Sequence, residues 1–194
     1  MNISYYTERE LGTLGFLHFG KQVLVSRKAS LYSPELISLG DYVRIDDFCI
    51  LSGRIQLGSH VHIGAYSALF GSQGIILGHY AGLSARVTIY TTSDDYLGRG
   101  MTNPTIPEQF RHVKKGATVL GDHVIVGAGS VILPQVTIGE GSAIGAMSLV
   151  TISVAPWKIA SGIPARSRAD RRKETIKTQQ KELEAIENRE RRKE

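Results

Sequence analysis

The sequence is poor in cysteine, in aromatic residues and in long apolar runs. A single cysteine among 194 residues, Cys49, excludes an internal disulfide and favours a reducing cytoplasm. Aromatic residues are 7% of the chain, which predicts an aliphatic interior. No apolar run approaches the roughly 20 residues that cross a bilayer, and residues 1–6 lack the basic and apolar regions of a signal peptide. We therefore expect a cytoplasmic protein without a membrane partner.

Charge is concentrated near the end of the chain. The formal net charge is +5, and much of it comes from residues 166–194, where Arg, Lys and Glu alternate. Such a mixture predicts a solvated helix with ion pairs four residues apart. A nucleic-acid-binding arm is the alternative, but the interleaved glutamates argue against it. A basic chain also suits a phosphorylated cofactor.

The chain carries an internal repeat of six residues, with an offset of two residues near Gly74 and a break after Ile89. Every first place of the repeat is Leu, Ile or Val: Leu39, Ile45, Leu51, Leu57, Ile63, Leu69, Leu77, Leu83, Ile89, Leu120, Val126, Ile132, Ile138, Ile144 and Val150. The second place is often glycine, and the fifth is small or β-branched. Neither a 3.6-residue helical period nor a two-residue strand period fits this pattern.

A six-residue period is explained by a triangular coil of parallel strands. Each repeat supplies one short strand and one corner, so three repeats complete a turn and each coil buries its apolar side against the next. We expect the first and fifth places to point inward, and the second-place glycines to adopt the backbone angles of the corners. The sequence therefore predicts an all-β solenoid.

The repeat pattern resembles that of the hexapeptide-repeat acyltransferases over roughly residues 20–165. The resemblance implies a left-handed parallel β-helix, a handedness that the period alone does not give. We divide the chain into an N-terminal helical cap at 1–22, with a Thr7–Glu10 capping box, a β-helix at 23–165 and a charged C-terminal helix at 166–194. Residues 91–116 break the repeat and are expected to form a protruding loop with a functional role.

The resemblance also implies a binding wall for acetyl-CoA. Gly127 and Ala128 lie 18 residues before Gly145 and Ala146, so Ala128 and Ala146 are expected to stack on adjacent coils and leave a groove for the pantetheine arm. The string from Gly162 to Arg166 resembles the family's terminal signature. It predicts Arg166, together with Lys158, near the phosphates of the cofactor. A purely structural role at narrow corners is the alternative.

The loop lacks a histidine that the related maltose and galactoside O-acetyltransferases use as a base. No histidine lies between His79 and His112, and Asp94 takes the corresponding place. An amine needs a weaker base than a hydroxyl does, so this replacement favours N-acetylation. Turn capping is the alternative role for the loop aspartates.

The strings at residues 44–48, 93–96, 102–107 and 127–134 resemble those of the sugar-nucleotide N-acetyltransferases, nearest to those that act on dTDP-4-amino-4,6-dideoxyglucose in O-antigen assembly. The resemblance implies direct attack of a sugar amine on acetyl-CoA, with Asp94 as the catalytic residue. The expected contacts to the nucleotide-linked amino sugar are Asp46, Asp47, His62, Ser93, Asp95 and Tyr96. It further implies a homotrimer with active sites between subunits. An O-acetyltransferase acting on a sugar or antibiotic hydroxyl, and a non-enzymatic structural β-helix, are the two alternatives.

Other reactive residues are given no catalytic role. Cys49 occupies an inward fifth place and is expected to be buried. His60 and His62 lie on outward places without a third ligand, and His112 and His123 are eleven residues apart, so no metal site is expected.

Overall fold

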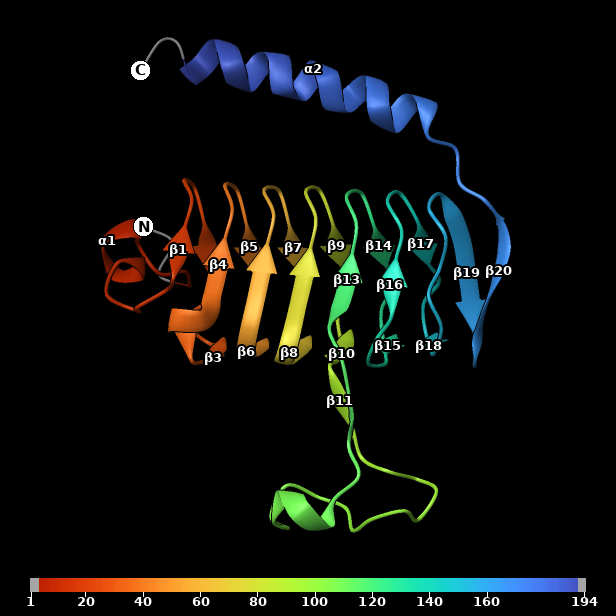
Figure 1. Ribbon diagram of the computed structural model, residues 1–194. Coiled ribbons are helices and arrows are strands. Elements are labelled where there is room, and N and C mark those ends of the chain that lie inside the picture. The colour runs from red at the N-terminus through yellow and green to blue at the C-terminus, as the bar shows by residue number, and fades with distance from the viewer. Residues whose placement is uncertain (1–3, 192–194) are drawn as a thin grey trace.

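The computed structural model describes residues 4–191 and shows a left-handed parallel β-helix with three flat faces (Figure 1). The first face is a parallel sheet of short strands. It consists of β2 (Leu24–Val25), β5 (Arg44–Ile45), β7 (His62–Ile63), β9 (Gly82–Leu83), β14 (Ile125–Val126), β17 (Ala143–Ile144) and β19 (Lys158–Gly162). Adjacent strands pair in parallel, with Ile45 opposite Ile63 and Ile63 opposite Leu83.

The other two faces share two long strands that bend around a corner. The second face contains β3 (Ser30–Tyr32), β10 (Thr88–Tyr90), β15 (Val131–Ile132), β18 (Leu149–Val150) and the first halves of β6 (Ile50–Leu57) and β8 (Ala68–Leu77). The third face contains β1 (His18–Phe19), β4 (Ile37–Leu39), β13 (Thr118–Leu120), β16 (Thr137–Ile138) and the second halves of β6 and β8.

The first and fifth places of the repeat fill the prism interior, as the sequence predicts. None of the fifteen first-place side chains named above is more than 3% exposed, and the fifth-place residues Val43, Cys49 and Ser67 are fully buried. Burial of this aliphatic column, at roughly 25 cal/mol per Å², is the main stabilisation of a chain so short of aromatic core residues. The six-residue period therefore correctly predicts which side chains form the core.

The second-place glycines are explained by close packing, and the expectation that they supply the corner angles is wrong. None of them has a positive φ. A Cβ on Gly127 would lie 2.4 Å from the backbone nitrogen of Ala146, and one on Gly40 2.6 Å from the backbone of Gly58. The left-handed angles occur instead at the fourth place, where side chains with φ near +60° include Tyr42, Phe48 and His60. At these glycines adjacent coils approach so closely that a Cβ would clash with the next backbone.

The two ends of the prism are closed by different elements. Helix α1 (Glu8–Leu11) begins at the Thr7–Glu10 capping box, which is present with both of its hydrogen bonds, and buries Leu11 against the first coil. At the other end β20 (Ala165–Asp170) pairs antiparallel with β19. Short 3₁₀ turns lie at Pro34–Leu36 and Glu108–Phe110.

The prism has three edges, which we name by what lies on them. The helix-covered edge consists of the corners 40–43, 58–61, 78–81, 121–124, 139–142 and 155–157, and α2 (Glu174–Arg191) runs along it (Figure 1). The open edge consists of the corners 46–49, 64–67, 84–87, 127–130 and 145–148. The loop edge consists of the corners 53–54, 71–74, 133–136 and 151–153, together with the projecting residues 91–117.

Candidate active site

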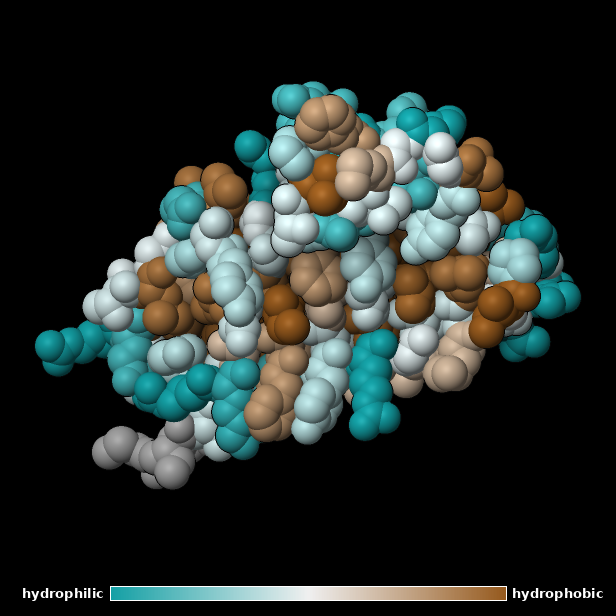
Figure 2. Space-filling view, turned by 90° about the horizontal axis from the view of Figure 1, so that it is seen from below, coloured by the Kyte–Doolittle hydropathy of each residue, from teal (hydrophilic) through white to brown (hydrophobic). Residues whose placement is uncertain are grey.

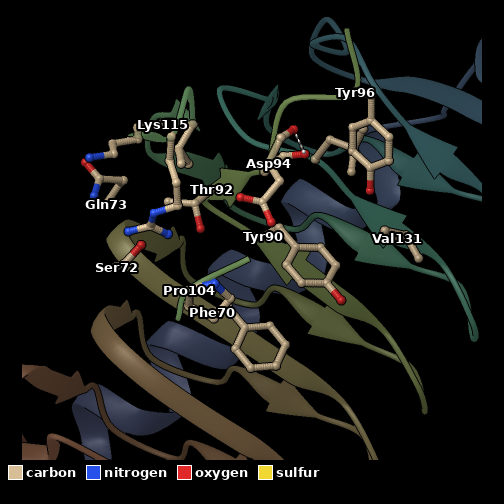
Figure 3. A pocket seen from close by; sticks show the side chains of 14 residues that line it. Phe70, Ser72, Gln73, Tyr90, Thr92, Asp94, Tyr96, Pro104, Lys115 and Val131 are labelled. Carbon is tan, nitrogen blue, oxygen red and sulfur yellow. Dashed lines mark hydrogen bonds between the residues drawn. The ribbon is translucent and has the colours of Figure 1, made fainter. Parts of the chain in front are cut away.

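A cavity of about 890 Å³ lies where the loop leaves the second face of the prism. The loop starts and ends in a short antiparallel pair, β11 (Thr92–Ser93) with β12 (Lys114–Lys115). Figure 3 shows the lining side chains, which come from β8, β10, β15 and the loop. They are Phe70, Ser72, Gln73, Tyr90, Thr92, Ser93, Asp94, Tyr96, Pro104, Arg111, Val113, Lys115, Val131 and Leu133. Because the second face joins the loop edge to the open edge, the cavity lies beside the proposed cofactor wall.

Asp94 is the carboxylate of this cavity. Its Oδ2 accepts a hydrogen bond from the backbone N–H of Asn103 at 3.0 Å, and Oδ1 makes no hydrogen bond within residues 4–191. The side chain is half-buried. The Ser93 hydroxyl donates to the Asp94 carbonyl at 3.3 Å, and both residues line the cavity with Tyr96. The structure therefore brings together three of the loop residues singled out in the sequence, with one carboxylate oxygen available.

Asp95 has a different environment and does not line the cavity. Its carboxylate accepts hydrogen bonds from the Arg99 backbone N–H at 2.6 Å, Nε at 3.0 Å and Nη2 at 2.8 Å. Only 1% of the side chain is exposed. The Arg99 guanidinium and backbone N–H lower the pKa of Asp95 below its usual value. This aspartate holds the turn at residues 95–99, the turn-capping role that the sequence left as an alternative.

Asp46 and His62 lie beside the open edge, outside the cavity lining. His62 Nε2 lies 2.8 Å from Asp46 Oδ2, Arg44 Nε donates to Oδ1 at 2.7 Å, and the Tyr5 hydroxyl donates at 3.4 Å. Partial burial raises the pKa of Asp46, but hydrogen bonds from His62 and Arg44 more than offset it, and the pKa is lowered. The carboxylate is therefore charged and already held by the side chains of His62 and Arg44.

Asp47 lies on the same corner and is paired in the same way. The Ser26 hydroxyl donates to its Oδ1, and Lys28 Nζ donates to Oδ2 at 2.9 Å. The hydrogen bond from Ser26 has the larger effect and that from Lys28 the smaller, and together they lower the pKa of Asp47. Within one chain, Asp46, Asp47 and His62 thus form a surface separate from the Asp94 cavity.

The expected cofactor residues lie at the C-terminal half of the open edge. Gly127 N–H donates to the Ile144 carbonyl at 2.8 Å, and Met147 N–H donates to the Ala128 carbonyl at 2.8 Å, so these corners stack directly. Ala128 and Ala146 are exposed. These small exposed side chains stand one above the other beside Met147, and we name the stretch along Ala128 and Ala146 the channel, after the groove expected from the sequence.

Of the two expected phosphate ligands, only Arg166 lies near this channel. It is exposed. Its backbone pairs with that of Ser161, and Ser161 lies directly against Gly145 on the adjacent coil. Lys158 is at the opposite end of β19, where its ammonium forms an ion pair with Asp170.

Comparison with known proteins places this geometry in a family. The family model of the bacterial transferase hexapeptide (six repeats) matches residues 117–151. The dTDP-4-amino-4,6-dideoxy-D-glucose acyltransferase of Escherichia coli is 38% identical over 187 residues, which are 95% of each chain. The chain belongs to the hexapeptide-repeat acyltransferases. It is an acyltransferase, and the E. coli relative matches nearly its whole length.

Solved structures extend this comparison to the fold. AntD, an N-acyltransferase from Bacillus cereus, in complex with dTDP and 3-hydroxybutyryl-CoA, is 46% identical with a TM-score of 0.93, over 96% of this chain and 100% of AntD. The S84C variant of AntD, with dTDP-4-amino-4,6-dideoxyglucose and coenzyme A, is 45% identical with a TM-score of 0.92, over 95% of this chain and 100% of AntD. The D94N variant, with dTDP and coenzyme A, is 46% identical with a TM-score of 0.90, over 94% of this chain and 99% of AntD.

In the structure of this acyltransferase, two further polar residues lie beside the open edge that were not singled out in the sequence. Ser84 lies on the open edge at a second place of the repeat, one coil from Gly127, and its hydroxyl makes no hydrogen bond within residues 4–191. A polar residue where glycine is the rule was the available signal. Arg168 Nη2 lies 3.5 Å from the Ser161 carbonyl, beside the same edge as Arg166. No comparable signal marks it, because its position depends on the β19–β20 reversal.

The remaining reactive groups of the acyltransferase lie away from the cavity. Cys49 is fully buried, and desolvation raises the pKa of its thiol to about 11, so it is no nucleophile at neutral pH. Within residues 4–191, His, Cys, Asp and Glu form no group of three that could hold a metal ion. In the same residues no helix is long and apolar enough to cross a membrane.

Proposed function

We propose that the acyltransferase moves an acetyl group from acetyl-CoA to the amine of a nucleotide-linked amino-deoxy sugar used for O-antigen or another surface polysaccharide. The observation that carries this proposal is the Asp94 carboxylate, which lines the cavity with one oxygen free and has no histidine beside it on the loop. His112 is exposed and outside the cavity lining. The acceptor class is supported by the E. coli relative and by AntD, which was solved with a dTDP amino sugar.

The reaction needs only a positioned amine and a proton acceptor. The neutral amine nitrogen attacks the thioester carbonyl carbon, and an N–C bond forms while negative charge develops on the carbonyl oxygen. Asp94 Oδ1 takes the proton that the nitrogen loses, the C–S bond breaks, and the coenzyme A thiolate leaves and takes up a proton. A carboxylate suffices as the proton acceptor, because the amine becomes strongly acidic once it is bonded to the carbonyl carbon.

The donor is assigned to the open edge. The pantetheine arm lies over Ala128 and Ala146, where exposed backbone groups of the Gly127 corner offer hydrogen bonds, and Arg166 lies near the phosphates. Lys158 is a weaker phosphate ligand in this proposal because Asp170 already neutralises it.

We also propose a cytoplasmic homotrimer whose subunits complete one another's sites. The loop projects far from the prism, and its Tyr96 and Leu97 side chains are 92% and 79% exposed (Figure 1). In this arrangement Asp46, Asp47 and His62 approach the acceptor from a neighbouring subunit. Asp95 does not contact the acceptor and only stabilises the turn of the loop that carries Asp94. Sedimentation at micromolar concentration is expected to give three chains; a monomer that retains full turnover would contradict shared sites.

The activity is tested by incubating the protein with acetyl-CoA and dTDP-4-amino-4,6-dideoxyglucose. We expect release of free thiol and a product heavier by one acetyl group. Parallel reactions contain dTDP-glucose, which offers only hydroxyls, and 3-hydroxybutyryl-CoA as a longer donor. Acetylation of dTDP-glucose at a similar rate would favour an O-acetyltransferase, and preference for the longer donor would replace the acetyl assignment.

The role of Asp94 is tested by Asp94→Asn. General base catalysis contributes typically about 10²–10⁴-fold, so we expect kcat to fall at least ~100-fold near neutral pH. The dissociation constant for coenzyme A serves as the internal control and is expected to stay within about twofold. Near-normal turnover in this variant would assign the proton to water.

A further inference from the structure

Arg111 is a cation of the cavity that forms no ion pair within residues 4–191, although its charge acts on the nearby Glu108 carboxylate. It follows the 3₁₀ turn Glu108–Phe110, where its backbone N–H donates to the Glu108 carbonyl at 3.0 Å, and its side chain lines the cavity. The Nε atom is buried and has no hydrogen-bond partner, the one such side-chain atom within the described residues. Leaving a buried donor of a charged group unsatisfied is unfavourable, so a ligand that accepts from it is favoured.

The neighbouring cations of the loop are differently placed. Arg99 is bound by Asp95 and Lys115 by Glu108, so both charges are neutralised within the chain. Lys114 is exposed to water and outside the cavity lining. Among residues 4–191, no carboxylate forms an ion pair with Arg111. Its forked donors therefore remain available to a ligand in the cavity.

The cavity offers a matched set of charges for a zwitterionic ligand. Asp94 supplies one carboxylate and Arg111 one guanidinium, and the neutral side chains of Ser72, Gln73 and Thr92 lie along the same wall (Figure 3). A nucleotide-linked amino sugar carries a cationic amine and an anionic diphosphate on opposite sides of one ring. Coenzyme A also has phosphates, but it has no ammonium group to complement the carboxylate.

We propose that Arg111 binds the diphosphate of the acceptor and thereby directs its amine toward Asp94. The inference rests on the proposed function and assigns a phosphate-binding residue to it. Guanidinium binds phosphate through paired N–H donors, and it keeps its charge at every relevant pH. Arg111 thus acts on substrate binding, and Asp94 on the chemical step.

The test compares Arg111→Gln, Arg111→Lys and Lys114→Gln. Lys114→Gln is the matched control, because it removes the same charge from the same loop without touching the cavity. Calorimetric titrations with dTDP alone and with coenzyme A alone separate the two phosphate sources. We expect Arg111→Gln to weaken dTDP binding about 10- to 100-fold, as for loss of a charge-assisted hydrogen bond, with coenzyme A binding unchanged within about twofold.

The two other variants and the kinetics complete the test. Arg111→Lys is expected to recover part of the dTDP affinity, and Lys114→Gln to bind both ligands like the wild type. In turnover, Arg111→Gln raises KM for the amino sugar more than it lowers kcat. Wild-type dTDP affinity in both folded Arg111 variants, or a loss confined to coenzyme A, would overturn the proposal. Failure of the wild type to use any nucleotide-linked amine would instead overturn the proposed function.

Discussion

The helix-covered edge and the open edge are built from the same repeat places, yet only one of them carries a segment of the chain. Along the helix-covered edge Tyr42, His60, Tyr80 and His123 stack, with ring centroids 4.6, 4.9 and 5.0 Å apart. Along the open edge only Phe48 and Tyr66 stack, at 4.9 Å, and the same place on the following coils holds Arg86, Gly129 and the exposed Met147. Stacked rings provide a surface for a helix, whereas this end of the open edge presents the small side chains of Ala128 and Ala146 beside Met147.

The contacts of α2 explain how it stays on its edge. Glu187 pairs with His60 at 2.9 Å, Gln180 lies 2.8 Å from His123 Nε2, and Lys177 pairs with Glu140. The apolar residues Leu183 and Ile186 are 38% and 53% exposed. The helix is therefore held by polar contacts to the corners.

The second face, seen from the side of the loop in Figure 2, differs from the helix-covered edge because hydrophobic residues are exposed along it.

The largest effect is expected where the coils of the open edge approach most closely. Gly127→Ala places a Cβ 2.4 Å from the Ala146 nitrogen, whereas Gly82→Ala meets nothing within 4 Å. We expect Gly127→Ala to lower the free energy of unfolding by about 2–3 kcal/mol through overpacking. Gly82→Ala is expected to leave it unchanged or raise it by up to ~1 kcal/mol. Chemical denaturation measures both, and equal effects would refute close packing as the reason for glycine.

The next effect concerns the channel itself. Ala146→Phe fills the open edge with a ring, while Ala185→Phe adds the same ring to the exposed side of α2. We expect the first variant to bind coenzyme A about 100-fold more weakly, or ~2.7 kcal/mol, and the second to bind it normally. Unchanged affinity in a folded Ala146→Phe protein would remove the cofactor from this edge.

A smaller effect is expected on the helix-covered edge. Glu187→Gln removes the charge that faces His60, and Glu182→Gln makes the same change on an exposed position. A single hydrogen bond to a charged group contributes about 1.5–3 kcal/mol, and a helix of this length is marginal alone. Proteolysis within α2 should therefore accelerate roughly tenfold in Glu187→Gln only. Equal protection in both variants would show that other contacts hold the helix.

The smallest effect is pH-dependent and concerns Asp46. Because His62 and Arg44 outweigh burial and lower its pKa, the folded state binds this proton less readily than the unfolded state. Asp46 therefore stabilises the fold above its ordinary pKa of 3.8, and this contribution is lost as the pH falls through the lower folded value. The melting temperatures of the wild type and Asp46→Asn should differ at pH 6 and converge as the pH falls below 3.8 and through the lower folded value. A constant difference would mean that the pairing is unimportant.

The sequence predicts the prism well because the six-residue period sets which side chains of each coil point inward, independently of the other coils. A first-place residue such as Ile63 is buried wherever the coils begin and end, so the core needs no knowledge of distant contacts. The loop resists this approach. Asp94 and Asp95 are adjacent and identical in type, and only the position of Arg99 shows that one is a structural anchor and the other faces a cavity.

The position of α2 was equally inaccessible to pattern reasoning. An amphipathic stripe normally identifies the buried side of a helix. Here the residues that meet the prism are Gln180, Glu184 and Glu187, whereas Leu183 and Ile186 are exposed. Arg111 was also missed, since a lone arginine in an irregular segment carries no signal until the loop is folded.

The narrow base of the loop has a consequence for the evolution of this family. Coil pairing continues across the insertion, with Thr88 opposite Val131 and Thr118 opposite Ile75, and only β11 and β12 join the loop to the prism. Residues between them can be exchanged without altering the register of any coil. The loop side of the cavity can thereby change while the prism side, and the corners of the open edge, keep their geometry.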